Sequence, residues 1–202
     1  FELDATTIFC QNLPPITVTT YNPSGNFSYE WTDENDIVIS NSPDAIISEE
    51  GTYTVIATST DGCESFPHTI IIEPSIIASI SQDDFTVVDD SSNNSITIST
   101  GNLGIGDYEF AINDSYGIYQ DEPYFENLTP GIYTVFIQDK NNCGIAQIDV
   151  SIIGFPKFFT PNNDGINDTW KVLGVNENFY STSLIYIFDR FGKLITKIDL
   201  KK

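Results

Sequence analysis

An internal repeat constrains the fold of this chain more than any other feature of the sequence. Residues 51–55 read GTYTV, and the related block GIYTV follows 80 residues later, at residues 131–135. In both copies a cysteine stands twelve residues after the glycine, as Cys63 and Cys143. A sequence that repeats in this way predicts two tandem domains of one architecture.

Each copy contains short segments rich in strand-forming residues. Ile, Val, Thr, Tyr and Phe recur in blocks separated by Gly, Pro, Asn, Asp and Ser, and no apolar run approaches the ~18 residues of a membrane span. In the first copy we expect strands at residues 16–21, 27–31, 37–39, 45–47, 51–58 and 68–73, with turns at Asn22-Pro23-Ser24-Gly25 and Asp61-Gly62. A period near 80 residues with about seven short strands predicts an all-β chain of tandem immunoglobulin-like β-sandwiches, at residues 1–75 and 76–153.

Aromatic residues repeated between the copies predict the two cores. In immunoglobulin-like folds a tyrosine hydroxyl bonds back to the backbone near the start of the sixth strand, and Tyr53 and Tyr133 match this tyrosine corner. We expect Trp31 and Phe110 to fill the cores from the third strand of each sandwich.

The charge of the chain restricts its partners. It carries 29 acidic and eight basic residues, with a net charge of −21. This balance disfavours nucleic acids and anionic membrane surfaces, which both require basic residues. Since no signal peptide or initiator methionine is visible, we expect a mature extracellular protein or a fragment of one. Divalent-cation binding at carboxylate clusters is the alternative use of the acidic residues.

Three cysteines are present. We expect a disulfide between Cys10 and Cys63, because both lie in the first copy and the bond would join its N-terminal strand to the turn after the tyrosine-corner strand. Cys143 has no such partner in its own copy. We interpret it as a small packed residue, with a free thiol or an intermolecular bond as the alternatives. This cysteine usage fits an oxidising compartment outside the cytoplasm.

No constellation in the sequence indicates catalysis. His68 is the one histidine, and nothing around it resembles a nucleophile motif. The chain has no phosphate-binding glycine loop and no H-E-x-x-H. We therefore predict that it is not an enzyme.

The densest motif lies at residues 155–170, which read FPKFFTPNNDGINDTW. Aromatic residues lead to Pro161, and an Asn/Asp/Gly turn follows. Side-chain oxygens at Asn162, Asp164 and Asp168, with the carbonyl of Ile166, could form a calcium cage. The pattern is not an EF-hand, because the acidic residues of its first and last positions are absent. The alternative is a network of Asx turns that closes the loop without a metal. A second acidic cluster, Asp83-Asp84 with Asp89-Asp90, is a further calcium candidate, with a solvated loop as its alternative.

A second motif, LIYIFDRFG at residues 184–192, follows the first. Together the two resemble the gliding-motility-associated C-terminal domain of Bacteroidota, which has an F-x-P-N-x-D-G-x-N-D-x-W segment and then an I-x-I-F-x-R-x-G strand and turn. That domain is similar to the type B sorting signal of the type IX secretion system. Since family members run on through several more strands, residues 154–202 are expected to form the N-terminal part of the domain, a partial β-sandwich.

The resemblance also marks residues for recognition by a partner. They are Phe155, Phe158, Phe159, Pro161, Asp164, Gly165, Asn167, Asp168, Trp170, Asp189, Arg190 and Gly192. We further expect a partly buried Arg190 to bond carboxylates or carbonyls of the 164–168 turn.

The resemblance implies a function at the cell surface. The chain would be the C-terminal region of a gliding-adhesin-like protein, exported by the type IX secretion system and associated with the outer membrane. Its implied partners are the secretion translocon and an outer-membrane β-barrel attachment protein. The two sandwiches, which resemble repeat modules of large surface adhesins, would act as stalk modules.

A second hypothesis concerns the sandwiches themselves. They could be carbohydrate-binding or adhesive modules of a secreted polysaccharide-active protein, with extracellular glycans as ligands. This use requires exposed aromatic side chains, and Tyr116, Tyr119 and Tyr124 are the candidates.

Overall fold

The computed structural model describes residues 2–3, 7–21, 25–166, 168–176, 178–180 and 183–199. In these residues the regular structure is almost entirely β, which confirms the predicted fold class, and two short 3-10 helices accompany the strands. The chain divides into two compact units. Unit 1 comprises Phe1–Ser79, Leu103–Tyr108 and Gln138–Ala146, and unit 2 comprises Ile80–Asn102, Glu109–Ile137 and Gln147–Lys202.

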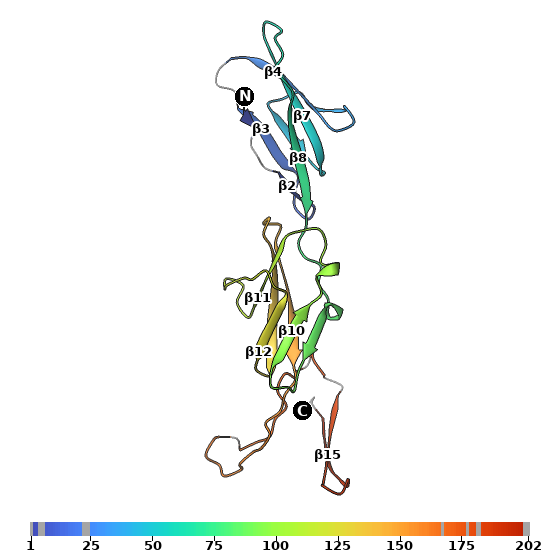
Figure 1. Cartoon of the computed structure of the whole chain (residues 1–202), viewed down its shortest axis with the longest axis vertical. Helices are drawn as coiled ribbons and strands as arrows, with labels where there is room; N and C mark the ends of the chain where they lie inside the picture. The colour runs from blue at the N-terminus through green and yellow to red at the C-terminus, as the bar shows by residue number, and fades with distance from the viewer. Residues whose placement is uncertain are drawn as a thin grey trace. The chain divides into compact units, whose positions relative to one another are not determined.

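Unit 1 contains the first β-sandwich (Figure 1). One sheet has the order β1-β3-β6 and the other the order β2-β8-β7-β4-β5. The strands are β1 (Glu2–Leu3), β2 (Ile8–Cys10), β3 (Ile16–Tyr21), β4 (Phe27–Thr32), β5 (Val38–Ser40), β6 (Asp44–Ile47), β7 (Gly51–Ser59) and β8 (His68–Ser75). Strand β2 runs parallel to β8, and the other pairs are antiparallel. The six strands expected from the sequence are all present, whereas Asn22, Pro23 and Ser24 lie outside the described residues.

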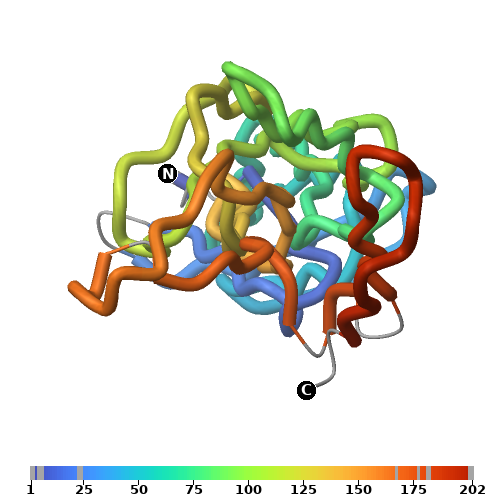
Figure 2. The backbone as a smooth tube through the Cα atoms, turned by 90° about the horizontal axis from the view of Figure 1, so that it is seen from below, coloured from blue at the N-terminus to red at the C-terminus, as the bar shows by residue number. Residues whose placement is uncertain are grey.

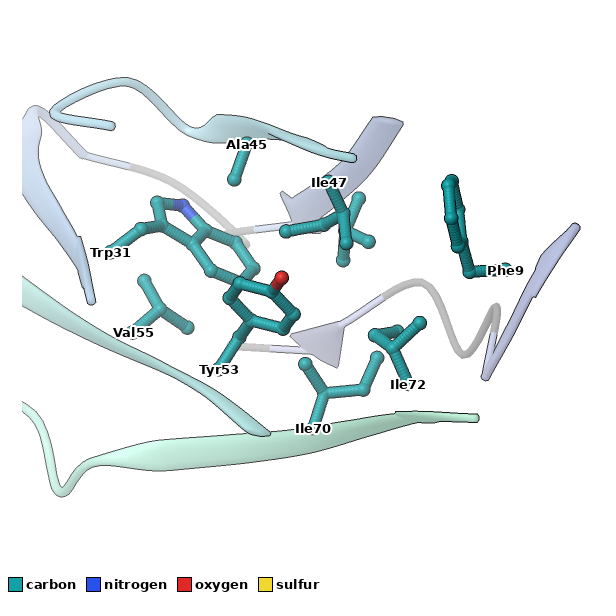
Figure 3. Packing of buried hydrophobic residues seen from close by; sticks show 9 residues of the cluster. Phe9, Trp31, Ala45, Ile47, Tyr53, Val55, Ile70 and Ile72 are labelled. Carbon is teal, nitrogen blue, oxygen red and sulfur yellow. The ribbon is translucent and has the colours of Figure 1, made fainter. Parts of the chain in front are cut away.

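The core of this sandwich forms where the strands alternate between inward and outward side chains. Trp31 of β4 and Val55 of β7 are fully buried, and Tyr53 lies beside them (Figure 3). The Tyr53 hydroxyl donates a hydrogen bond to the carbonyl of Glu49, two residues before β7, at 2.9 Å. The predicted core aromatic and tyrosine corner are therefore confirmed in the first copy.

The second copy of the repeat builds a sheet of order β12-β10-β9 and a sheet of order β11-β13-β14. These elements are η1 (Gln82–Asp84), β9 (Phe85–Val88), β10 (Asn94–Ile98), η2 (Thr100–Asn102), β11 (Tyr108–Ile112), β12 (Tyr124–Leu128), β13 (Gly131–Asp139) and β14 (Ile145–Ile152). Phe110 and Val135 are buried, and the Tyr133 hydroxyl donates to the Thr129 carbonyl at 2.7 Å. The repeat thus reproduces both the core aromatic and the tyrosine corner.

The disulfide joins Cys10 to Cys143, with their Cα atoms 5.3 Å apart. Cys63 is free and exposed. The predicted Cys10–Cys63 bond is therefore wrong, as is the interpretation of Cys143 as unbonded. The reason lies in β8: Cys10 pairs with Ser75 at the end of this strand, whereas Cys63 precedes its first residue. An eight-residue strand spans roughly 23 Å, far beyond the ~7 Å that a disulfide bridges between Cα atoms.

Beside the disulfide, a buried carboxylate joins three segments of unit 1 by hydrogen bonds. Asp139 is fully buried, and its Oδ2 accepts hydrogen bonds from the Ser75 hydroxyl at 3.0 Å and the Cys143 amide at 3.1 Å. Its Oδ1 accepts from the Asp107 amide at 3.2 Å. Burial and, secondarily, the negative charge of Asp139 raise the pKa of Tyr108. The hairpin at residues 138–146 is thereby bonded to Ser75 at the end of β8 as well as to Cys10 of β2 through the disulfide.

Residues 154–174 join the second sandwich at the end of β14. The amide of Leu173 donates to the carbonyl of Gly154 at 2.7 Å, and the Ser151 hydroxyl donates to the carbonyl of Gly174. Gly174 has a φ of 78°, and a Cβ there would collide with the Ile152 carbonyl oxygen. Glycine is therefore required at this close approach.

Two further strands, β15 (Leu184–Phe188) and β16 (Leu194–Asp199), form an antiparallel two-stranded sheet. In Figure 2 the backbone traces this hairpin in red and the loop at residues 155–170 in orange. No helix among the described residues has both the length and the apolar character that crossing a membrane demands.

Candidate recognition surface

The loop around Gly165 is closed by two aspartates. The Oδ1 and Oδ2 atoms of Asp168 accept hydrogen bonds from the amides of Asn163 and Gly165, at 2.6 and 2.7 Å. Asp164 accepts from the Ile166 amide at 2.8 Å and from the Asn162 side-chain amide at 2.8 Å. These bonds, first the one from the Ile166 amide, lower the pKa of Asp164.

The backbone of this loop requires its turn residues. Asn163 and Gly165 have φ values of 60° and 84°, in the left-handed region that asparagine and glycine tolerate. The structure places Asn162, Asp164 and Asp168 in one hydrogen-bonded loop, where both carboxylates accept from N–H donors. The Ile166 carbonyl accepts from the Thr160 hydroxyl at 3.3 Å. This is the arrangement of the Asx-turn alternative. Among the described residues no group of three acidic, histidine or cysteine side chains is placed to hold a metal, and calcium binding stays a prediction.

One member of the second acidic cluster, Asp84, faces polar donors. Asp84 is buried and accepts hydrogen bonds from the amide and hydroxyl of Ser81 and from the side chain of Asn102. These bonds, first the one from Asn102, lower the pKa of Asp84. The carboxylate thus caps η1, and a role in cation binding stays a prediction here too.

Aromatic side chains lie beside the closed loop. The Trp170 indole N–H donates to the Pro156 carbonyl at 3.0 Å, and the rings of Phe155 and Trp170 are 6.0 Å apart. Phe158 and Phe159 are 67% and 52% exposed. An open groove of about 510 Å³ lies here, and its lining residues are Pro130, Phe155, Pro156, Gly165, Asp168, Thr169, Lys171 and Leu173.

The turn of the β15–β16 hairpin is built in a similar way. Oδ1 of Asp189 accepts from the amides of Phe191 and Lys193, at 2.8 and 2.9 Å, and Gly192 has a φ of 80°. Arg190 is exposed, and its guanidinium lies 4.7 Å from the centre of the Phe191 ring. The predicted partly buried Arg190 is wrong, because the side chain is exposed, and in the described residues no ion pair joins it to Asp164 or Asp168.

The two faces of the hairpin differ. Ile185, Ile187 and Ile198 are half-buried, whereas Tyr186 and Phe188 are exposed on the other face, with ring centres 6.5 Å apart. A smaller groove of about 310 Å³ lies between the half-buried face and residues 170–175. Its lining residues are Trp170, Lys171, Val172, Val175, Ile185, Ile198 and Asp199. The hairpin therefore buries one face only partly and leaves the other open.

The charge of the chain is unevenly distributed, which the overall composition concealed. Residues 153–202 contain seven basic and five acidic residues, whereas residues 1–152 contain one basic and 24 acidic residues. The two sandwich copies are therefore strongly anionic, and the C-terminal segment is slightly cationic. Lys197 belongs to this segment, with its ammonium 5.7 Å from the Tyr186 ring centre.

The predicted recognition residues lie at two places. Those of the first motif, Phe155 to Trp170, lie on or beside the closed loop, except Asn167, which is outside the described residues. Asp189, Arg190 and Gly192 lie at the tip of the hairpin. Sequence reasoning missed Pro130 and Leu173 in the groove, because Pro130 comes from the second sandwich and neither belongs to the motif.

Comparison with protein families bears on this surface. Residues 153–201 match the family model of the CHU_C type IX secretion signal domain. The match confirms the resemblance to a type IX secretion sorting signal. The signal covers both motifs, and it supports export to the cell surface or the extracellular space. A comparison with curated proteins found no match.

Solved structures with related β-domains include the fibronectin(III)-like modules of Clostridium thermocellum CbhA, at 15% identity, with 75% of this chain and 93% of that chain covered and a TM-score of 0.42. The FN1–FN3 domains of chicken CNTN1 share 15% identity over 74% of this chain and 66% of that chain, with a TM-score of 0.36. Bacteroides ovatus SGBP-B, solved with a mixed-linkage heptasaccharide, shares 14% identity over 75% of this chain and 43% of that chain, with a TM-score of 0.28. Scores this low add nothing about function.

Proposed function

We propose that this chain is the C-terminal region of a gliding-adhesin-like cell-surface protein, and that its type B sorting segment is recognised by the outer-membrane partners of the type IX secretion system. The two sandwiches serve as non-catalytic stalk modules. The family match at residues 153–201 is the observation that carries this proposal.

The exposed aromatic side chains support recognition through the first motif. The Asp164 and Asp168 hydrogen bonds fix the loop that follows Phe158 and Phe159, so this loop loses little entropy when a partner binds beside the two exposed rings. Aromatic side chains on such a fixed frame are typical binding hot spots.

The hairpin supports recognition through its strand edges. Among the described residues β15 pairs with β16 alone, and an isolated two-stranded hairpin is marginally stable in water. Its free edges can accept a strand from another protein, and the exposed Tyr186 and Phe188 would pack against the side chains of that strand. The net positive charge of the segment favours an acidic partner surface.

An export assay with exposed-residue variants tests the proposal. The double substitution Phe158→Ser/Phe159→Ser should reduce surface display at least tenfold while leaving the unfolding midpoint unchanged, because both rings are exposed. Phe66→Ser is the matched control, since Phe66 is 89% exposed and lies in unit 1. Unchanged display of the double variant would contradict recognition through these rings.

A second candidate function, glycan binding by the second sandwich, is favoured by one observation. Tyr116 is 96% exposed, as a sugar-stacking ring must be. Tyr119 is half-buried and donates its hydroxyl to the Ser115 carbonyl at 3.1 Å, and burial raises its pKa. Glycan-array binding that is lost in Tyr116→Ala and retained in Tyr124→Ala would support this function, and the absence of any bound glycan would refute it.

A further inference from the structure

Cys63 and Cys143 occupy the same hairpin position in the two copies of the repeat. The Cys63 amide donates to the Ser59 hydroxyl at 3.1 Å, and the Cys143 amide donates to the Asp139 carboxylate at 3.1 Å. In each case the acceptor is the side chain four residues before the cysteine, near the end of the tyrosine-corner strand. The two side chains thus frame their cysteines in the same way.

The backbone of the two turns agrees as well. The Gly62 amide donates to the Ser59 carbonyl at 2.9 Å, and the Asn142 amide donates to the Asp139 carbonyl at 3.0 Å. Gly62 and Asn142, each directly before the cysteine, have φ values of 81° and 65°. The two turns therefore agree as far as the cysteine. Beyond it they differ, because the Ser59 amide donates to the Cys63 carbonyl, whereas the Asp139 amide donates to the carbonyl of Gly144.

The second copy shows what such a hairpin binds. Cys143 is bonded to Cys10 at the end of β2. Strand β2 belongs to the first sandwich and runs parallel to its last strand, β8. Asn12 completes the contact, since its side-chain amide donates to the Cys143 carbonyl at 2.8 Å and its side-chain carbonyl accepts from the Ile77 amide at 3.0 Å. The receptor position, Cys10, thus lies at the end of β2 in one sandwich, and the hairpin that docks on it belongs to the next copy of the repeat.

We propose that Cys63 is the equivalent docking cysteine of the first copy, and that its partner is a cysteine at the Cys10 position of a further sandwich of the same class. The placement of the other cysteines supports this assignment. The second copy has no counterpart of Cys10, and residues 153–202 contain no cysteine for it to meet. Within residues 1–202, a hairpin cysteine of the following copy meets the one cysteine at this receptor position, Cys10.

The bond forms by thiol–disulfide exchange with a disulfide-bearing oxidant. The Cys63 thiolate attacks one oxidant sulfur to form a mixed disulfide and release one oxidant thiolate. The partner thiolate then attacks Sγ of Cys63 and releases the second oxidant thiolate. Two protein thiols lose two protons and two electrons, and the oxidant disulfide is reduced to two thiols.

One difference between the hairpins defines the partner further. Gly144 lies against Ile77, and a Cβ at Gly144 would be 3.0 Å from Cδ1 of Ile77. The first copy has Glu64 at this place. The best-fitting partner sandwich therefore carries a residue smaller than Ile at the position of Ile77, which leaves room for the Glu64 side chain.

A fusion protein tests the proposal. Residues 1–80, with Ile77→Ala, are placed directly ahead of the complete chain, so that the added Cys10 precedes the original Cys63 by the same 133 residues that separate Cys10 from Cys143. After oxidation with glutathione disulfide, peptide mapping should find a bond between these two cysteines beside the original disulfide. The fusion contains five cysteines, and only the added Cys63 should then react with a thiol reagent. Three reactive thiols, or a Cys10–Cys63 bond within the added copy, would overturn the proposal.

Two controls make the result specific. The first control moves the thiol within the same turn of the fusion: in the original residues 1–202, Cys63→Ser is combined with Thr60→Cys. This change should abolish the new bond and leave three reactive thiols. The unfused chain provides an independent measurement that does not depend on folding of the added copy. Its Cys63 should react with the reagent in the native state, and an unreactive Cys63 would also overturn the proposal.

Discussion

Substitution of Cys143 by Ser tests the energetic role of the disulfide. The bond closes 133 residues of chain, and the chain-entropy model assigns about 5 kcal/mol to a loop of this length. Native disulfides typically contribute about 2–5 kcal/mol. Because the Cys143 amide keeps its bond to Asp139, the substitution removes the covalent link and leaves the polar frame of the hairpin in place. We expect the free energy of unfolding of unit 1 to fall by about 2–5 kcal/mol.

Urea unfolding followed by tryptophan fluorescence measures this loss. The chain has two tryptophans, and in a Trp170→Phe background the remaining one is Trp31, which is fully buried in the core of unit 1. With a slope of about 2 kcal/mol per molar urea, the midpoint should fall by roughly 1–3 M.

The matched control is Cys63→Ser, which removes an exposed free thiol and should leave the midpoint unchanged. A reductant should lower the midpoint of the parent protein to that of Cys143→Ser and should have no further effect on the variant. Equal midpoints for the two serine variants, or a reductant effect that persists in Cys143→Ser, would refute the assignment of stability to this disulfide.

The remaining predictions concern the buried polar groups. Asp139→Ala removes the hydrogen-bond acceptor of the buried Cys143 amide and Ser75 hydroxyl, and it should lower the free energy of unfolding in urea by about 2–4 kcal/mol. The control Asp107→Asn, at an exposed ion pair, should change this free energy by less than about 1 kcal/mol. Equal losses in the two variants would contradict the role of Asp139. Tyr133→Phe should cost about 1 kcal/mol by deleting the hydrogen bond to Thr129, and an unchanged midpoint would count against that bond. Burial and the Glu49 carboxylate raise the pKa of Tyr53, so the unfolded chain releases this proton first. The stability that the protonated Tyr53 contributes is fully present below pH 10.0 and is lost as pH rises through the folded-state pKa. The thermal unfolding midpoint should therefore fall less above pH 10.0 in Tyr53→Phe than in the parent protein.

The sequence predicted the sandwiches because their signals are local and repeated. Alternating apolar residues define the strands, and the G-x-Y-x-V block anchors each tyrosine corner, so both Trp31 and Phe110 were placed in cores correctly. The Asn/Asp/Gly pattern near Gly165 likewise carries its own turn chemistry, which the structure shows as Asx hydrogen bonds.

Contacts between distant segments were harder to predict. Cys63 and Cys143 stand at equivalent positions, so local pattern alone cannot choose which of them meets Cys10. The length of β8 decides it, because this strand separates the Cys63 turn from the end that holds Cys10. The sequence did not indicate that Asp139 is buried, because it is one of 29 acidic residues. Only the structure shows the Cys143 amide and the Ser75 hydroxyl that donate to its carboxylate.

Surface display in a bacterium with a type IX secretion system tests the central claim most directly. A periplasm-targeted fluorescent protein is fused to residues 1–202 and, as the matched control, to residues 1–152, which lack the matched signal domain. The account predicts that the longer fusion reaches the cell surface only when the secretion machinery is present and that the shorter fusion stays in the periplasm. Retention of the longer fusion, or display that persists without the machinery, would contradict it.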